Sequence, residues 1–185
     1  MRITVGMTGS TGAVYGVRML EVLSSLGVRT HLIMSDWAKK CISMETGRSP
    51  ADVAALATAV SEDSNMAASV SSGTSASDGM IVAPCSMKTL AAISHGYDET
   101  LVARAAGVTI KESRRLVLMA RETPLSAIHL ENMLRLARIG VVILPPVTEF
   151  YTSPRTIDDI VDHGVGKCLD QFSLDHGLYR RWGGA

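Results

Sequence analysis

The chain has 185 residues, of which 46% are hydrophobic and 4% aromatic, and its 18 basic and 18 acidic residues cancel. This length predicts one domain, residues 1–185, with an aliphatic core. A neutral chain lacks the basic surface that nucleic-acid binding requires, and without a long apolar run or a leader pattern we expect neither a membrane span nor a signal peptide. Three cysteines without paired spacing (Cys41, Cys85 and Cys168) favour reduced thiols and a cytoplasmic protein.

A glycine-rich turn joins the first predicted strand, residues 3–7, to a helix that begins near Gly12. Backbone N–H groups at such a helix start attract anions, and glycine lets a phosphate approach the backbone. The spacing Gly9-x-x-Gly12-x-x-x-Gly16 matches neither the Walker pattern nor a strict GxGxxG pattern. The turn therefore predicts a phosphate site, with a tight turn that binds no ligand as the alternative.

The rest of the chain alternates apolar strands with helices. Periodicity and turn residues predict strands at 28–34, 79–83, 116–120 and 141–144, and helices at about 12–26, 36–45, 50–60, 87–95, 100–115, 123–139 and 157–172. The helix at 123 is expected to begin with Thr123 as N-cap and Pro124 in its first turn. The spacing Thr156-x-x-Asp159 predicts a capping box at the start of the last helix. Residues 61–78 lack periodicity and form the longest predicted loop. Apolar strands between helices predict an α/β fold, with a mainly parallel sheet covered on both faces.

Chemically distinctive segments follow the predicted strands, at residues 9–12, 35–37, 84–89, 121–122 and 145–151. Ligands of parallel α/β sheets bind beyond the carboxyl ends of the strands, so we expect these segments to meet at one edge. Two hydroxyl-bearing helix starts, at Ser10 and Ser86, suit a phosphate and a polar ring system, with N-capping by Ser86 as the alternative. Asp36 stands where dinucleotide folds carry an acidic residue, but the first turn favours a mononucleotide over NAD.

Charged residues allow further hypotheses. Glu122, after a strand, is suited to acid or base chemistry beside Arg121, and a solvated pair is the alternative. Glu45 alone indicates a solvated helix end, and Lys111 alone indicates a favourable helix-dipole contact. Cationic and hydroxyl side chains elsewhere suggest a second anion site, and these are Arg104, Tyr151, Lys167, Arg180 and Arg181. Their spacing in the sequence does not establish that they converge. The five scattered histidines lack metal-ligand spacing, so no metal is expected.

Ordered segments along nearly the whole chain carry a family resemblance. They include VGMTGSTGAVYGVRMLE, THLIMSDWAK, SSGTSASDGMIVAPCSMKTLAAI, RAAGVTIKESRRLVLMARETPLSAIHLENML and ILPPVTEFY. Through them the chain resembles the UbiX-like flavin prenyltransferases, and more narrowly those that accompany bacterial non-oxidative hydroxyarylic acid (phenolic acid) decarboxylases as their partner subunits. The resemblance implies a three-layer α/β/α Rossmann-like flavoprotein fold. It also implies an enzyme that joins a dimethylallyl group from dimethylallyl phosphate to N5 and C6 of reduced FMN, for use by a UbiD-like decarboxylase.

The resemblance further implies a cytoplasmic homo-oligomer, a dodecamer, whose sites lie between subunits. The residues implied to contact FMN are Gly9, Ser10, Thr11, Ser35, Ser86, Met87, Lys88, Thr89 and Arg121. Those implied to bind the prenyl phosphate are Arg104, Lys111, Tyr151, Lys167 and Trp182, with Glu122, Glu45 and Ser72 as catalytic residues.

Three positions depart from the family pattern. Thr11 replaces a common Ser and keeps the hydroxyl, Gly107 replaces the Asp of RAAD and is expected to loosen its helix, and Lys167 replaces Arg and loses the bidentate fork. The alternative function is a flavin-binding accessory or directly decarboxylating subunit of a phenolic acid decarboxylase complex. Glu122, Tyr151 and Lys167 favour prenyl transfer, because a pure binding module would not require Glu122.

Overall fold

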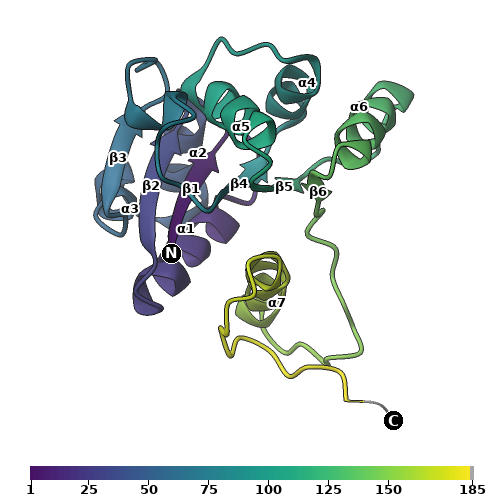
Figure 1. Cartoon of the computed structure of the whole chain (residues 1–185). Coiled ribbons are helices and arrows are strands. Elements are labelled where there is room, and N and C mark those ends of the chain that lie inside the picture. The colour runs from purple at the N-terminus through teal and green to yellow at the C-terminus, as the bar shows by residue number, and fades with distance from the viewer. Residues whose placement is uncertain (184–185) are drawn as a thin grey trace.

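Six parallel strands form one sheet in the order β3-β2-β1-β4-β5-β6 (Figure 1). The computed structural model describes residues 1–183, so residues 184–185, the end of the predicted domain, lie outside the described residues. The strands are β1 (Arg2–Met7), β2 (Arg29–Met34), β3 (Ala59–Glu62), β4 (Gly79–Cys85), β5 (Arg115–Ala120) and β6 (Val142–Ile143). The helices are α1 (Ala13–Ser25), α2 (Asp36–Thr46), α3 (Pro50–Ala54), α4 (Met87–His95), α5 (Leu101–Lys111), α6 (Ala127–Arg138) and α7 (Ile157–Asp170), with a 3₁₀ turn, η1, at Ser69–Ser71.

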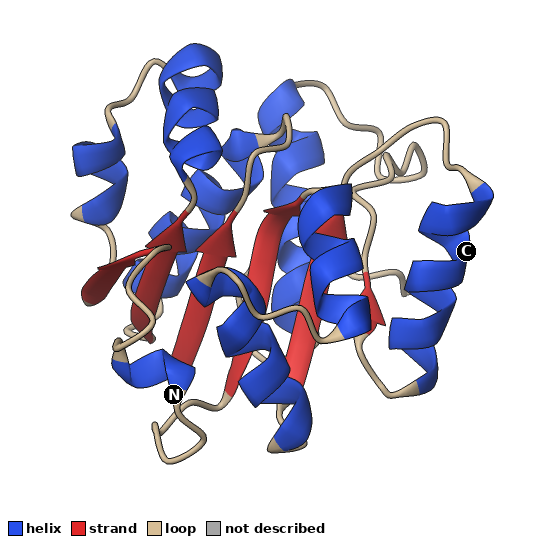
Figure 2. Ribbon diagram, turned by 90° about the horizontal axis from the view of Figure 1, so that it is seen from above, coloured by secondary structure: helices blue, strands red, loops and turns tan. Residues whose placement is uncertain are grey.

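Side chains of the strands alternate between two apolar cores. Val5 of β1 and Ile81 of β4 pack with α1, α2, α3 and α7, whereas Met80 and Val82 of β4 pack with α4, α5 and α6. Figure 2 shows the resulting arrangement, with helices on both sides of the sheet. Burial on both faces explains why the strands are continuously apolar. The predicted three-layer α/β/α fold with a parallel sheet is confirmed.

The helix predicted over residues 50–60 is wrong in its second half. α3 ends at Ala54, and Ala59–Glu62 forms β3, which pairs in parallel with β2 through His31 and Ala59. β3 is a short edge strand whose side chains are mostly exposed, so its identity depends on pairing with β2 and not on an apolar period. The strand also shortens the predicted loop, which contains η1 as well.

The predicted start of α6 is also wrong. The helix begins at Ala127, and its N-cap is Ser126 instead of Thr123. The Ser126 hydroxyl accepts the His129 N–H at 3.3 Å, while Nδ1 of His129 accepts the Ser126 N–H at 3.3 Å. This capping box satisfies two donors at once, which a cap at Thr123 followed by proline would not do. Elsewhere α5 ends four residues before the predicted 115, ahead of Ser113 with its positive φ of 54°.

No helix within residues 1–183 has both the length and the apolar character needed to cross a membrane.

Candidate functional site

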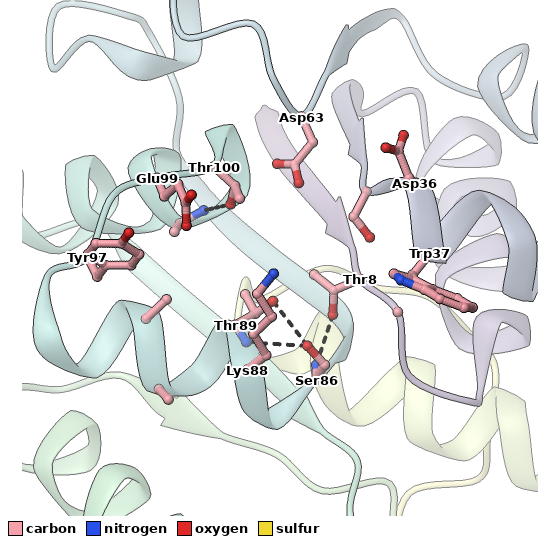
Figure 3. Close-up of a pocket in the computed structure, with 15 residues that line it drawn as sticks. Thr8, Asp36, Trp37, Asp63, Ser86, Lys88, Thr89, Tyr97, Glu99 and Thr100 are labelled. Carbon is pink, nitrogen blue, oxygen red and sulfur yellow. Dashed lines mark hydrogen bonds between the residues drawn. The ribbon is translucent and has the colours of Figure 1, made fainter.

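A cavity of about 580 Å³ opens beyond the carboxyl ends of the first four strands (Figure 3). It lies beside the place where the strand order reverses, between β1 and β4, which is where open α/β sheets bind ligands. Five residues expected to contact a flavin line it together, namely Gly9, Ser35, Ser86, Lys88 and Thr89. The other lining residues include Thr8, Asp36, Trp37, Asp63, Tyr97, Glu99 and Thr100.

Two helix N-termini face this cavity. The Ser35 hydroxyl caps α2 by accepting the Ala38 N–H at 3.1 Å, and the Ser86 hydroxyl caps α4 by accepting the Thr89 N–H at 3.3 Å. The Ser86 hydroxyl also donates to Oγ1 of Thr89 at 3.1 Å. Neighbouring N–H groups in each first turn remain free for a ligand, and both helix dipoles favour negative charge there. The arrangement therefore suits a phosphate between α2 and α4.

Thr8, which the sequence analysis missed, fixes the start of α4. Its buried hydroxyl donates to the carbonyl of Pro84 at 2.9 Å and accepts the N–H of Ser86 at 2.8 Å. This single hydroxyl ties the end of β1 to the loop between β4 and α4. The only sequence signal for it was a hydroxyl-bearing residue placed directly between an apolar strand and a glycine turn.

Gly9 has no room for a side chain because Trp37 packs directly against it. A Cβ added to Gly9 would overlap Cβ of Trp37. The Trp37 indole is nevertheless 65% exposed, and Nζ of Lys40 lies 4.2 Å from its ring centre. Tyr97, also exposed, lies across the cavity from Trp37 in Figure 3. The cavity thus combines a polar floor with aromatic side walls, as small-molecule sites commonly do.

The start of α1 is occupied by Glu45. Oε2 of Glu45 accepts the N–H groups of Gly12 and Ala13 at 2.8 and 2.9 Å. The carboxylate takes the position that a phosphate would take at this helix start. The starts of α2 and α4 are therefore the better candidates for a phosphate. The interpretation of Glu45 as a merely solvated helix end is wrong.

Ser10 and Arg121 lie beside the same helix start. The Ser10 hydroxyl donates to the carbonyl of Arg121 at 3.2 Å, which joins the loop after β1 to the loop after β5. Glu122 is exposed and accepts the Thr123 N–H through Oε1 at 3.0 Å. Of the other expected flavin contacts, the side chain of Met87 packs partly against the core below α4, and that of Thr11 is exposed.

Tyr15, also missed, links this region to the segment before α7. Burial raises the pKa of Tyr15, and the negative charge of Glu149 raises this pKa further, while Arg121 lowers it. The Tyr15 ring packs over Gly164 of α7, where an added Cβ would come within 3.0 Å of it. A tyrosine three residues after a predicted helix start gave no hint of this position in the sequence.

Ser72 and Lys111 lie at the opposite edge of the sheet. α5 runs antiparallel to the strands from the cavity, so Lys111, at its last turn, lies about 15 Å from the helix start. Nζ of Lys111 donates to Glu112 at 2.6 Å, close to Gly73. Ser72 lies next to Gly73 and its hydroxyl pairs with that of Thr74 at 2.9 Å. One chain therefore does not bring Ser72 and Lys111 to the flavin cavity.

Arg104 lies on α5 between the cavity and Lys111, and two contacts hold its side chain. NH1 donates to Oδ2 of Asp98 at 3.1 Å, and Nε donates to the carbonyl of Ser71 at 3.1 Å. Gly107, one turn further along α5, makes room for Asp98, because an added Cβ would lie 3.1 Å from Oδ1 of Asp98. α5 is continuous through Gly107, in contrast to the loosening expected there. The glycine serves to admit the carboxylate that pairs with Arg104.

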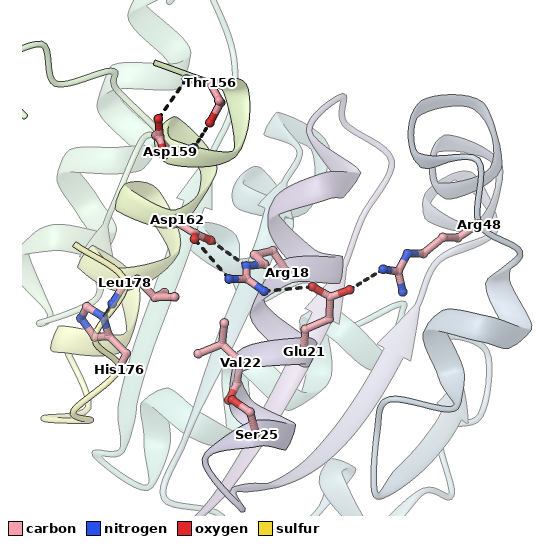
Figure 4. Close-up of polar contacts among 10 residues, drawn as sticks. All are labelled: Arg18, Glu21, Val22, Ser25, Arg48, Thr156, Asp159, Asp162, His176 and Leu178. Atoms are coloured by element: carbon pink, nitrogen blue, oxygen red, sulfur yellow. Dashed lines mark hydrogen bonds and ion pairs between the residues drawn. The ribbon is translucent and has the colours of Figure 1, made fainter. Parts of the chain in front are cut away.

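Ion pairs attach α7 to α1 (Figure 4). Arg18 donates to the carboxylate of Asp162 through Nε at 2.6 Å and NH2 at 3.1 Å, and its NH1 lies 3.3 Å from Glu21, which also pairs with Arg48. The hydrogen bond that Arg18 donates to Asp162 raises the pKa of Arg18. Thr156 and Asp159 form the predicted capping box of α7. This network is partly exposed, so it adds modestly to the apolar packing of α7.

Tyr151 and Trp182 meet in a second cavity of about 590 Å³ beside α7. Their rings are perpendicular, with centroids 5.6 Å apart. The cavity is also lined by three arginines, Arg155, Arg180 and Arg181, and by His163 and Tyr179. Lys167 is exposed on α7 and is not part of this lining.

Neither a metal cluster nor a reactive thiol marks the site. Within the part of the chain that the structure describes, no three His, Cys, Asp or Glu side chains are grouped to hold a metal ion. Burial raises the pKa of Cys85 to about 12 and also raises the pKa of Cys168. These thiols stay protonated and unreactive at neutral pH.

Comparisons with known proteins agree with this geometry. The flavoprotein family model matches residues 1–169. The flavin prenyltransferase UbiX of Thauera aromatica is 50% identical over 184 residues, which cover 100% of this chain and 95% of that protein. AnUbiX, solved in complex with FMN and dimethylallyl pyrophosphate, superposes with a TM-score of 0.98 at 54% identity, covering 100% of this chain and 98% of that one. A dodecameric FMN-dependent UbiX-like decarboxylase from Escherichia coli O157:H7 superposes with a TM-score of 0.98 at 56% identity, with 100% of both chains covered. The chain therefore belongs to the flavoprotein family and, within it, to the UbiX-like flavin prenyltransferases.

Proposed function

We propose that this protein, as one domain over residues 1–185, joins the dimethylallyl group of dimethylallyl phosphate to N5 and C6 of reduced FMN. The observation that carries the proposal is the cavity at the reversal of the strand order, which the capped starts of α2 and α4 face. The chain is also 54% identical to AnUbiX, which was solved in complex with FMN and dimethylallyl pyrophosphate. We infer that the prenylated flavin serves a UbiD-like decarboxylase in the cytoplasm, as the family resemblance implies.

The residues around the cavity fit FMN. The phosphate would take the starts of α2 and α4, where Ser35, Ser86 and Thr89 supply hydroxyl groups and Lys88 supplies a positive charge. The remaining flavin contacts are assigned to the adjoining loops, at Gly9, Ser10, Thr11, Met87 and Arg121. A cavity of about 580 Å³ lies within the usual range for cofactor sites. Bound reduced FMN would supply the nucleophilic N5 and C6 atoms.

The prenyl end of the site requires more than one copy of the chain. Lys111 and Ser72 lie at the sheet edge opposite the cavity, whereas Tyr151 and Trp182 lie beside α7. α6 presents exposed apolar side chains, including Ile128, Leu130, Leu134 and Ile139. Large exposed apolar surfaces of this kind mark protein interfaces. We therefore propose a homo-oligomer, a dodecamer like the Escherichia coli relative, in which neighbouring copies complete each site.

The proposed residues suit the departure of an allylic phosphate. When the allylic C–O bond breaks, the electron pair leaves with the phosphate, so Arg104, Lys111 and Lys167 would stabilise the departing charge and the Tyr151 hydroxyl would donate to it. The Trp182 ring would stabilise the positive allylic fragment. Glu122 would exchange a proton during the reaction, and the other catalytic residues would be Glu45 and Ser72, with Ser72 supplied by a neighbouring copy. Since basic side chains hold the phosphate, no metal is required.

The test is direct. Protein incubated with dithionite-reduced FMN and dimethylallyl phosphate should yield a flavin heavier by one prenyl unit, with a changed absorption spectrum. Unmodified flavin, together with release of CO₂ from a phenolic acid, would contradict prenyl transfer and support the decarboxylating alternative.

Lys167 gives a residue-level version of the test. Lys167→Ala should leave FMN bound, since FMN is held elsewhere, and raise the half-saturating concentration of dimethylallyl phosphate by about tenfold or more, the scale of one lost charge-assisted contact. Lys167→Arg, which keeps the charge, should change it little. Equal half-saturation in wild type and Lys167→Ala would return Lys167 to the solvated surface.

A further inference from the structure

His163 of α7 is a buried histidine without a hydrogen-bond partner. The side chain is 4% exposed, and neither ring nitrogen makes a hydrogen bond within residues 1–183. Nδ1 lies only 2.7 Å from Oε2 of Glu149, close enough for an ion pair but off the direction of a hydrogen bond. Buried polar groups in proteins are normally paired, so an imidazole in this position calls for a functional explanation.

Aromatic rings surround the imidazole. The ring of Tyr179 lies 4.4 Å away with a tilt of 37°, and the ring of Tyr151 lies perpendicular to it at 6.2 Å. Trp182 is in turn perpendicular to Tyr151 at 5.6 Å. Edge-to-face contacts of this kind favour one mutual orientation of the rings. A continuous series of contacts therefore runs from α7 through His163 and Tyr151 to Trp182.

The segment that carries Tyr151 has few other attachments, whereas Arg181 and Tyr179, which lie beside Trp182 in the sequence, both donate to Asp170 of α7. Residues 145–156 and the chain after α7 both extend away from the sheet (Figure 1), and Tyr151 contacts Trp182 between them. Backbone hydrogen bonds in the first segment are local, such as that from Ser153 to Phe150, and none joins the two segments within residues 1–183. Tyr151 and Trp182 are 58% and 69% exposed. The orientation of Tyr151, and with it the edge-to-face contact between Tyr151 and Trp182, therefore depends on the side-chain packing around His163.

We propose that His163 is a positioning residue for the prenyl end of the site. Its imidazole, held between Glu149 and Tyr179, fixes the ring of Tyr151 and, through Tyr151, the indole of Trp182. Lys167 lies one helical turn further along α7, so the proposed phosphate contact projects from the same face of the helix. The expected effect on dimethylallyl phosphate binding rests on the proposed function. The expected effect on the orientation of Tyr151 and Trp182 does not.

The kinetic test uses His163→Phe, with His176→Phe as the matched control. Phenylalanine keeps a ring but leaves Glu149 without an imidazole, so residues 149–151 should shift. His176 packs on the same Tyr179 ring at 5.1 Å and lies 3.3 Å from Asp170, but does not contact Tyr151. His163→Phe should raise the half-saturating dimethylallyl phosphate about five- to tenfold, the scale of one lost polar contact, with unchanged FMN affinity and nearly unchanged maximal rate. The control, His176→Phe, should leave the half-saturating concentration, the FMN affinity and the maximal rate unchanged.

The structural test needs no turnover. The chain has two tryptophans, so in a Trp37→Phe background the fluorescence reports Trp182 alone. Adding His163→Phe should increase acrylamide quenching of Trp182, and adding His176→Phe should not. If the phenylalanine variant does not fold, His163→Gln, which lacks the ring, should give the same increase. The proposal would be overturned if His163→Phe changed neither the quenching nor the half-saturating concentration, or if His176→Phe changed them equally. Absence of turnover in the wild-type protein would count against the proposed function only.

Discussion

Replacing Thr8 by valine should weaken both the fold and FMN binding, because one hydroxyl supports both. Valine keeps the shape of threonine but removes the donor to the Pro84 carbonyl at 2.9 Å and the acceptor of the Ser86 N–H at 2.8 Å. The Pro84 carbonyl retains the backbone N–H of Thr8 at 3.2 Å. The N–H group of Ser86, the residue that caps α4, loses its acceptor, the Thr8 hydroxyl.

The magnitude follows from that unpaired N–H group. Leaving a buried donor unpaired costs about 1–3 kcal/mol, and the additional buried methyl group of valine offsets up to about 0.8 kcal/mol. The free energy of unfolding should therefore fall by about 1–2 kcal/mol. A displaced Ser86 should also deprive the FMN phosphate of one charge-assisted hydrogen bond, worth about 1.5–3 kcal/mol, which raises the Kd for FMN about 10- to 150-fold.

The assays are urea unfolding at fixed protein concentration, since assembly makes stability concentration-dependent, and titration of FMN by its fluorescence. Thr4→Val is the matched control, because Thr4 is also buried on β1 but its hydroxyl makes no hydrogen bond within residues 1–183. Thr4→Val should leave FMN affinity unchanged. The reasoning is refuted if the two variants are equally stable and bind FMN equally well.

Three further substitutions test the site. Gly9→Val forces a side chain into Trp37 and should abolish FMN binding without loss of helical circular dichroism; wild-type FMN affinity would show that the turn is not part of the flavin site. Asp98→Ala removes the partner of Arg104 and should raise half-saturating dimethylallyl phosphate about two- to fivefold, the scale of a partly exposed ion pair, so an unchanged titration would exclude this positioning. Glu122→Gln should retain FMN and slow product formation, measured by mass, about 10²-fold or more; unchanged turnover would remove Glu122 from the proton transfer.

The layered fold could be predicted because its signals are local and repeated. The apolar runs at 79–83 and 116–120 required a sheet buried on both faces, and the helix caps at Ser86 and Thr156 are visible in the sequence and confirmed. The missed strand, β3, lies at the sheet edge with mostly exposed side chains. Its formation depends on pairing with β2, a contact between segments that no local pattern records.

The flavin end of the site was more predictable than the prenyl end. Gly9, Ser35 and Ser86 each follow a strand, and parallel topology alone brings such residues to one edge. Lys111 has no comparable signal, and its assignment came from the family resemblance. His163 was one of five scattered histidines, and its burial depends on how α7 packs on the rest of the chain.

The proposed division of the site between the two ends of the strands would separate FMN binding from prenyl transfer. The cavity between α2 and α4 is formed by loops of one chain, whose positions are fixed by the strands that precede them. Lys111 lies at the far end of α5, a helix whose residues are mostly buried. FMN binding should therefore be a property of each chain, whereas phosphate departure becomes efficient only where a neighbouring chain supplies its cations. If neighbouring chains bind the prenyl phosphate together, as proposed, assembly would also exclude water from the reacting carbon and so protect the allylic fragment from hydrolysis.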